Sequence, residues 1–165
     1  TQGRMDMAVL SDETWRRHAN PWSVWTRYAA FPLLVGAMWS YHVIGWWALL
    51  PVAVMIGFLY INPWLFPPPR STDNWASKAV LGERVWLNEG KRALPDQHPR
   101  IFRALMVISV VNLAGLIWGI VQSDALVLVL STVNVLVGKS WFNDRMVWLF
   151  SERMRTNPEY KSWLY

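Results

Sequence analysis

The sequence predicts an all-α integral membrane protein in which four membrane-spanning helices form two hairpins. The chain of 165 residues is 53% hydrophobic and contains 13 tryptophans, more than an ordinary soluble core needs. Four apolar runs of about 17–18 residues each reach the lower limit for crossing a hydrocarbon core of ~30 Å. The 16 Lys and Arg residues are confined to three segments, so positive charge alternates with apolar sequence along the chain.

The four apolar runs define the predicted hairpins. They extend from Tyr28 to Ile44, from Ile44 to Ile61, from Ala104 to Val121 and from Ala125 to Phe142. None has the polar face that a helix in a soluble bundle presents to water, so a soluble four-helix bundle is the less favoured alternative. The first run starts too late for a signal peptide and has no cleavage site after it, so we expect it to remain as the first span.

The basic residues predict the orientation in the membrane. They lie in residues 1–27, in residues 62–103 and from Lys139 onward, whereas the two other connections contain none. By the positive-inside rule both termini and the central segment are cytoplasmic. A single membrane domain over residues 1–165 follows, with hairpins at 28–61 and 104–142 and a cytoplasmic segment at 143–165. Its basic face is expected to attract anionic lipids, whereas scattered charges of this kind do not favour nucleic acid.

The tripeptide Asn-Pro-Trp occurs twice, at residues 20–22 and 62–64. One copy precedes the first span and the other follows the second, so both are predicted at the cytoplasmic interface. Proline starts or ends a helix, asparagine caps the freed backbone groups, and tryptophan favours the headgroup level. The favoured interpretation is a pair of boundary markers; the alternative is that the paired Asn and Trp side chains converge into a pocket.

Three cytoplasmic segments are expected to be helical. In residues 75–86 the spacing of Trp75, Ala79, Gly82 and Trp86 places them on one face, which predicts an amphipathic helix lying on the membrane surface. Residues 11–19 predict a shorter helix of the same kind, with Ser11 as its cap. The stretch from Trp141 to Met154 is expected to continue the fourth span.

Few polar residues fall inside the spans. Asn112 and Asn134 lie at equal depth in the second hairpin, so we predict a hydrogen bond between their amides. Gly115 and Gly119 form a GxxxG pattern that permits close helix packing, within the bundle or between protomers. Lys139 is expected to extend towards the interface. No Asp or Glu lies in a span, which argues against a proton-coupled transporter.

The motifs "HANPWSVWTR", "NPWLFPPP", "NWASKAVLGERVWL" and "WFNDRMVWL" together resemble an uncharacterised domain-of-unknown-function family of small prokaryotic membrane proteins. The resemblance covers most of the chain. It implies four helices and a bacterial or archaeal inner membrane, and it names neither an activity nor a cofactor.

Three classes of function stay open. The favoured one is a non-enzymatic accessory, binding or sensory protein, self-associating or joined to a membrane partner, whose Trp-rich cytoplasmic rim contacts lipid, a hydrophobic ligand or a protein. The candidate rim residues are His18, Asn20, Trp22, Trp25, Arg27, Asn62, Trp64, Asp73, Asn74, Trp75, Glu83, Arg84, Trp86, Asp144 and Arg145.

The second class is an interfacial enzyme. Its candidate acids, bases or metal ligands are His18, Asp73, Glu83, His98 and Asp144. No catalytic or metal-binding spacing supports it, so we assign no catalytic residue and no metal ligand. The absence of cysteine excludes thiolate chemistry. The third class is a small oligomeric channel lined by Asn112 and Asn134.

Overall fold

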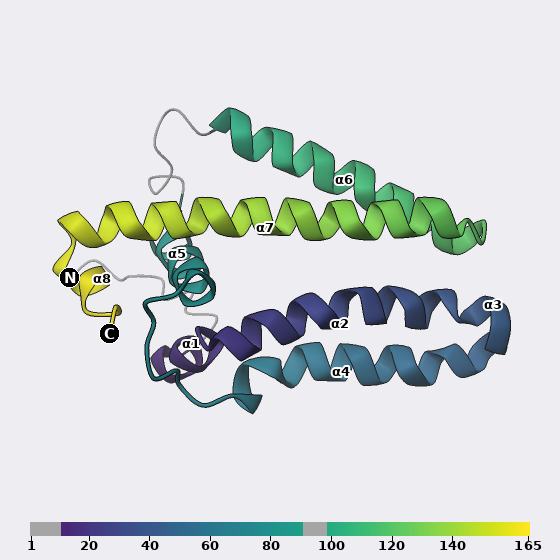
Figure 1. The fold of residues 1–165 in the computed structure, drawn as a ribbon, viewed down its shortest axis with the longest axis horizontal. Helices are drawn as coiled ribbons and strands as arrows, with labels where there is room; N and C mark the ends of the chain where they lie inside the picture. Colours follow the sequence, from purple (N-terminus) through teal and green to yellow (C-terminus); the bar gives the residue numbers. More distant parts are fainter. Residues whose placement is uncertain (1–10, 91–98) are drawn as a thin grey trace, which may run out of the picture.

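The computed structural model describes residues 11–90 and 99–165, and this part of the chain is all-α, as predicted. The elements are α1 (Asp12–His18), α2 (Pro21–Trp39), α3 (Tyr41–Ile44), the 3-10 helix η1 (Gly45–Ala48), α4 (Leu49–Leu65), α5 (Trp75–Glu89), α6 (Pro99–Val121), α7 (Ala125–Thr156) and α8 (Pro158–Lys161). Figure 1 shows two pairs of long helices: α2 and α4 run side by side, whereas α6 contacts α7 near the turn that joins them and diverges from it towards its own N-terminus. The short helices α1, α5 and α8 gather at one end, around the last turns of α7.

Three stretches of the described chain are long and apolar enough to cross a membrane: Pro21–Leu65, Arg103–Val121 and Ala125–Thr156. The first contains 45 residues, but the chain reverses direction within it at α3 and η1 (Figure 1). Large apolar side chains on these stretches point outward; Leu33, Val54, Val110 and Leu126 are each exposed over more than half of their surface. Continuous apolar exposure of this kind is typical of a surface that faces lipid.

The two Asn-Pro-Trp copies occupy different places in their helices. Asn20 is the N-cap of α2, accepting a 2.9 Å hydrogen bond from the Trp22 backbone, and Pro21 takes the first helical position. Pro63, by contrast, lies inside the last turn of α4, which continues to Leu65. The first copy therefore begins a helix, whereas the second does not by itself end one.

Helix α5 is more deeply packed than the amphipathic pattern predicts. Ala79, Val80, Gly82 and Val85 are all buried, and α5 packs against α7 as well as against α1 and α2. A Cβ atom at Gly82 would overlap the backbone carbonyl of Met146 in α7. The small residues of the amphipathic pattern let α5 cross α7 closely. We use "head" for this end of the molecule: α1, α5, α8 and the part of α7 from Phe142 onward.

Helix α7 connects the apolar pairs to the head. Its 32 residues extend over ~48 Å at 1.5 Å per residue. The C-terminal stretch therefore continues the last apolar run as one helix, as predicted. The first half packs on α6, where Gly115 faces Ser131 and Gly119 lies so close that a Cβ would stand 2.9 Å from the Leu128 backbone. The GxxxG pattern thus brings together two helices of the same chain.

The structure does not pair Asn112 with Asn134. The Asn112 amide donates a 2.8 Å hydrogen bond to the Ile108 carbonyl of its own helix, and Asn134 is exposed. The contacts of Gly115 with Ser131 and of Gly119 with Leu128 place residues 112 and 134 at similar levels. The α6-facing side of α7, however, carries Leu128, Ser131 and Thr132, and Asn134 lies on another face. The two asparagines therefore lie at similar depth, as predicted, but Asn134 is on a face of α7 that does not point towards α6.

Candidate functional site

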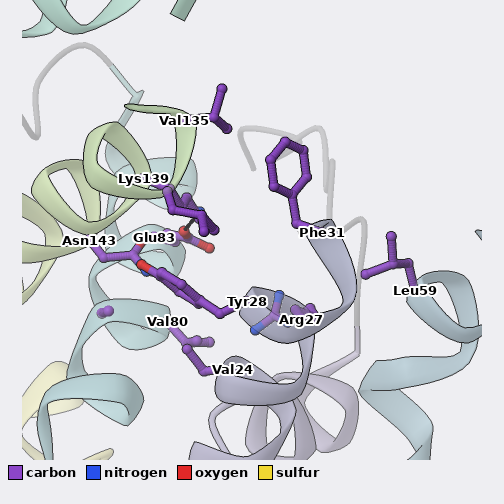
Figure 2. Close-up of a pocket in the computed structure, with 12 residues that line it drawn as sticks. Val24, Arg27, Tyr28, Phe31, Leu59, Val80, Glu83, Val135, Lys139 and Asn143 are labelled. Atoms are coloured by element: carbon purple, nitrogen blue, oxygen red, sulfur yellow. Dashed lines mark hydrogen bonds and ion pairs between the residues drawn. The ribbon is translucent and has the colours of Figure 1, made fainter. Parts of the chain in front are cut away.

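A cavity of about 270 Å³ lies where α2, α4, α5 and α7 meet, beside the head (Figure 2). It is lined by Val24, Arg27, Tyr28, Phe31, Leu59, Ala79, Val80, Glu83, Val135, Leu136, Lys139 and Asn143. Every one of the four helices contributes, so the site exists only when the helix pairs and the head are assembled. Several lining side chains, such as Phe31 and Leu59, are partly exposed, so the cavity communicates with the outside of the helices.

The walls of the cavity are apolar. Towards the α3 end, Phe31 and Val135 also pack on a small buried cluster of Val35, Leu116 and Leu128, which joins α2 to the α6–α7 pair. This cluster limits the cavity on the side away from the head. The result is an apolar chamber between the helix pairs that ends in polar groups near α5.

The polar end contains two sets of hydrogen-bonded side chains. The Lys139 ammonium donates a 2.8 Å hydrogen bond to Oε1 of Glu83, joining α7 to α5. The Tyr28 hydroxyl accepts bonds from the Asn143 amide, at 3.0 Å, and from the Ser140 hydroxyl, at 3.3 Å. Figure 2 shows Tyr28 reaching from α2 to Asn143 on α7, next to the Glu83–Lys139 pair. These contacts hold the polar ends of three helices together.

Arg27 completes the polar end, and its described hydrogen-bond partners are neutral. Its Nε donates to the Ser23 carbonyl at 3.0 Å, and its Nη1 lies 2.8 Å from Nε2 of His18. Because a guanidinium can only donate, Nε2 of His18 must accept, and the proton of the neutral ring is then on Nδ1. Within the described residues that buried Nδ1 has no hydrogen-bond partner.

The environment holds His18 in its neutral form. Burial, followed by the positive charges of Arg27 and Lys139, lowers the pKa of His18 to about 3. The ring is 9% exposed and packs edge-on against Trp15 at 5.9 Å. The imidazole therefore accepts a hydrogen bond from Arg27 without adding a charge to the site.

We expect a pH dependence of stability from His18. Above its ordinary pKa of about 6.5 the ring is neutral in both states, whereas between pH 6.5 and 3 only the unfolded chain takes up the proton. The free energy of unfolding should then fall by about 2 kcal/mol between pH 7.5 and pH 5. Thermal unfolding of wild type and of His18→Gln at both pH values measures this loss. An equal loss in the two proteins would contradict the neutral buried ring.

The remaining rim residues serve several local purposes. Asn20 also donates to the Pro67 carbonyl at 2.8 Å, and Asn62 is fully buried between hydroxyl groups of α2. Asn74 is the N-cap of α5, and Asp73 pairs with Lys78. Tryptophans 22, 25 and 64 are exposed, and Trp25 stacks on Trp75 at 5.7 Å.

Glu83 and Arg84 are adjacent in α5 but line different cavities. Arg84 pairs with Asp12 and lies 4.1 Å from the Trp163 ring, in a more polar cavity of about 350 Å³ within the head. Trp86 packs on Phe142 at 5.9 Å, and Arg145 pairs with its neighbour Asp144 at 2.7 Å. The rim residues are therefore divided among separate clusters and do not form one site.

The enzyme candidates that lie within residues 11–90 and 99–165 are not assembled into a centre. Asp73 and Asp144 pair with different cations, and His98 lies outside the described residues. In the part of the chain that the structure covers, no three His, Asp or Glu side chains gather as a group that could hold a metal ion.

Sequence reasoning missed several residues of the cavity. Tyr28 and Asn143 are 115 positions apart, and no spacing links them. The prediction that Lys139 extends towards the interface did not anticipate its pairing with Glu83. His42 was also missed: its Nε2 bonds the Ile120 carbonyl, joining α3 to the end of α6. Of these residues, only Lys139 could have been recognised from the sequence, because a cation next to an apolar run is unusual.

A comparison with known protein families finds a match over almost the whole chain. A family model described as "Family of unknown function (DUF6653)" matches residues 1–162. No curated protein and no solved structure matches the chain.

Proposed function

The chain belongs to the family of unknown function DUF6653, and we propose that it is a non-enzymatic membrane protein that binds an amphipathic ligand in the cavity between its helix pairs. The main support for this proposal is the cavity, which has apolar walls at one end and hydrogen-bonding and charged groups at the other. Ligand pockets commonly combine apolar walls with a few convergent polar groups.

The proposed membrane arrangement has four crossings, formed by α2, α4, α6 and the first half of α7. The reversal within Pro21–Leu65 supports two crossings there, and the other two apolar stretches supply one each. The basic residues lie in the segments on the head side of the apolar stretches, and with the positive-inside rule this supports a cytoplasmic head and cytoplasmic termini. A prokaryotic inner membrane is part of the same proposal. Exposed Trp22, Trp25 and Trp64 then lie at the headgroup level, where indole rings are favoured.

Reporter fusions test this arrangement. Ser123 lies in the short connection between α6 and α7, at the opposite end from the head. We expect a reporter inserted at Ser123 to be external and one fused after Tyr165 to be cytoplasmic. A cytoplasmic signal from Ser123 would overturn the four-crossing arrangement.

The dimensions of the cavity support a lipid-like ligand. Its volume of about 270 Å³ is near the lower end of small-molecule pockets, which start at ~300 Å³. A ligand with a long apolar tail would therefore seat its head and first carbons in the cavity, and its tail would continue between the helices into the bilayer. Membrane lipids are the proposed source of such molecules. Self-association of the chain stays a separate prediction.

Filling the cavity should abolish binding. Val135 and Leu59 line the cavity from different helices, α7 and α4. We expect Val135→Trp and Leu59→Trp each to reduce retention of single-chain amphiphiles at least tenfold, because the indole occupies the apolar chamber. Native mass spectrometry with monoolein and oleate as probes measures the retained molecules.

The matched control is Val133→Trp, at an α7 residue that is 51% exposed and outside the cavity lining. It should retain as much probe as wild type, and thermal unfolding verifies that all three variants fold. If the two cavity variants also keep wild-type retention, the cavity is not the binding site.

A further inference from the structure

The polar end of the cavity carries more positive than negative charge. Among the lining residues Arg27 and Lys139 are cationic and Glu83 is anionic, and the nearby His18 is neutral. Tyr28 and Asn143 contribute uncharged groups. Two cations against one carboxylate leave one net positive charge in a chamber whose walls are apolar.

That excess charge belongs to Arg27. The Glu83 carboxylate accepts a 2.8 Å hydrogen bond from Lys139, whereas the described hydrogen-bond partners of Arg27 are the Ser23 carbonyl and the His18 ring. The Glu83 carboxylate acts on Arg27 through its charge but is hydrogen-bonded to Lys139 and not to the guanidinium. In a partly desolvated site, neutral acceptors compensate only part of the hydration that a guanidinium loses. An anion that reaches the guanidinium would therefore stabilise the site.

The hydrogen-bonding capacity of Arg27 leads to the same conclusion. A guanidinium has five N–H donors in a fixed planar fork, and two of its nitrogens, Nε and Nη1, are engaged by one acceptor each. The remaining donors suit the oxygens of a carboxylate or a phosphate, which accept two parallel bonds. A cationic head would instead be repelled by both Arg27 and Lys139.

We propose that the ligand of this cavity is a single-chain lipid with an anionic headgroup, a carboxylate or a phosphate ester, which binds Arg27 and lies close to the Glu83–Lys139 pair. This inference rests on the proposed function, since it specifies the head of the ligand whose apolar part occupies the same cavity. Charge-assisted hydrogen bonds of this kind change affinity by about tenfold to a hundredfold.

The experiment compares three probes that share one acyl chain and differ in the head: oleate, oleoyl lysophosphatidate and the neutral monoolein. Affinities are measured by native mass spectrometry titration of the purified full chain at pH 8. Wild type should bind at least one anionic probe tenfold or more tightly than monoolein. Preference for oleate alone identifies a carboxylate, preference for lysophosphatidate alone identifies a phosphate, and both together identify shared anion chemistry.

Two substitutions of opposite sign test the role of charge. Arg27→Gln should weaken the preferred anion tenfold or more while monoolein changes less than threefold. Glu83→Gln should strengthen that anion severalfold, because it removes the competing carboxylate and releases Lys139. A gain of affinity cannot arise from partial misfolding. The matched control is Arg103→Gln, which removes one positive charge from an exposed position on α6 outside the cavity lining.

Failure of this inference is distinguishable from failure of the proposed function. If monoolein binds wild type as tightly as both anions, and Val135→Trp still abolishes binding, the cavity is a lipid site without anion selectivity and the inference is overturned. Equal loss of anion affinity in Arg27→Gln and Arg103→Gln also overturns it. If Val135→Trp affects no probe, the proposed function itself fails.

Discussion

Gly82→Ala is expected to destabilise the protein by about 3 kcal/mol, because the new methyl group has no space. The Cβ would overlap the carbonyl oxygen of Met146 and stand 2.9 Å from its Cα. These are backbone atoms of a buried residue, so they cannot rotate aside as a flexible side chain can. The helix propensity gained by alanine, ~1 kcal/mol, is too small to offset the overlap. Thermal unfolding of the purified protein in detergent measures the difference.

The matched control is Gly138→Ala in α7. Nothing lies within 4 Å of a Cβ at Gly138, so alanine should be neutral or stabilising by ~0.5–1 kcal/mol. Because Gly82 precedes Glu83 in α5, displacement of α5 from α7 should also separate the Glu83–Lys139 pair and lower ligand retention. Equal unfolding temperatures for the two variants would mean that α5 and α7 do not cross as closely as the structure shows.

Local chemistry made two of the helix caps predictable. Ser11 and Asn20 were anticipated as caps because short polar side chains satisfy the first free backbone N–H groups of a helix, and the structure confirms both. The all-α class and the apolar stretches could also be predicted from the sequence, since each depends on the composition of a single segment. The apolar run that starts at Tyr28 begins later than α2 itself, which starts at Pro21, because hydropathy marks only the apolar part of the helix.

The site itself could not be predicted, since it depends on contacts between distant segments. An apolar stripe on residues 75–86 indicates that one face is covered, but it does not say whether lipid or protein covers it. The contact between Gly82 and Met146 shows that protein covers this face, and that contact is visible only in the folded structure. Likewise, Arg27 and Glu83 were selected as rim residues from their chemistry, yet their roles depend on His18 and Lys139 as partners. The rim hypothesis grouped these residues by their expected depth in the membrane. The fold divides the same residues among separate clusters.

Asn62→Leu is expected to destabilise the protein by about 2 kcal/mol, because it orphans polar groups inside the α2–α4 pair. Asn62 is 0% exposed; its Oδ1 accepts a 2.7 Å bond from Ser23, and its amide donates to Thr26 Oγ1 at 2.9 Å. Leucine has a similarly branched side chain but no hydrogen-bonding group, so it leaves the fully buried Ser23 hydroxyl without that acceptor. Unfolding in detergent measures the loss.

The control for this prediction is Asn134→Leu, which changes the same residue types at an exposed position of an apolar helix and should be neutral or stabilising. The double variant Ser23→Ala with Asn62→Leu should lose less than the sum of the two single variants, since it removes both members of the buried bond at once. Strict additivity, or an Asn62→Leu protein as stable as Asn134→Leu, would contradict the network. The repeated tripeptide would then act at each boundary separately. With the network intact, Asn62 of the second copy binds Ser23 and Thr26 in the helix that the first copy begins, and so joins α4 to α2.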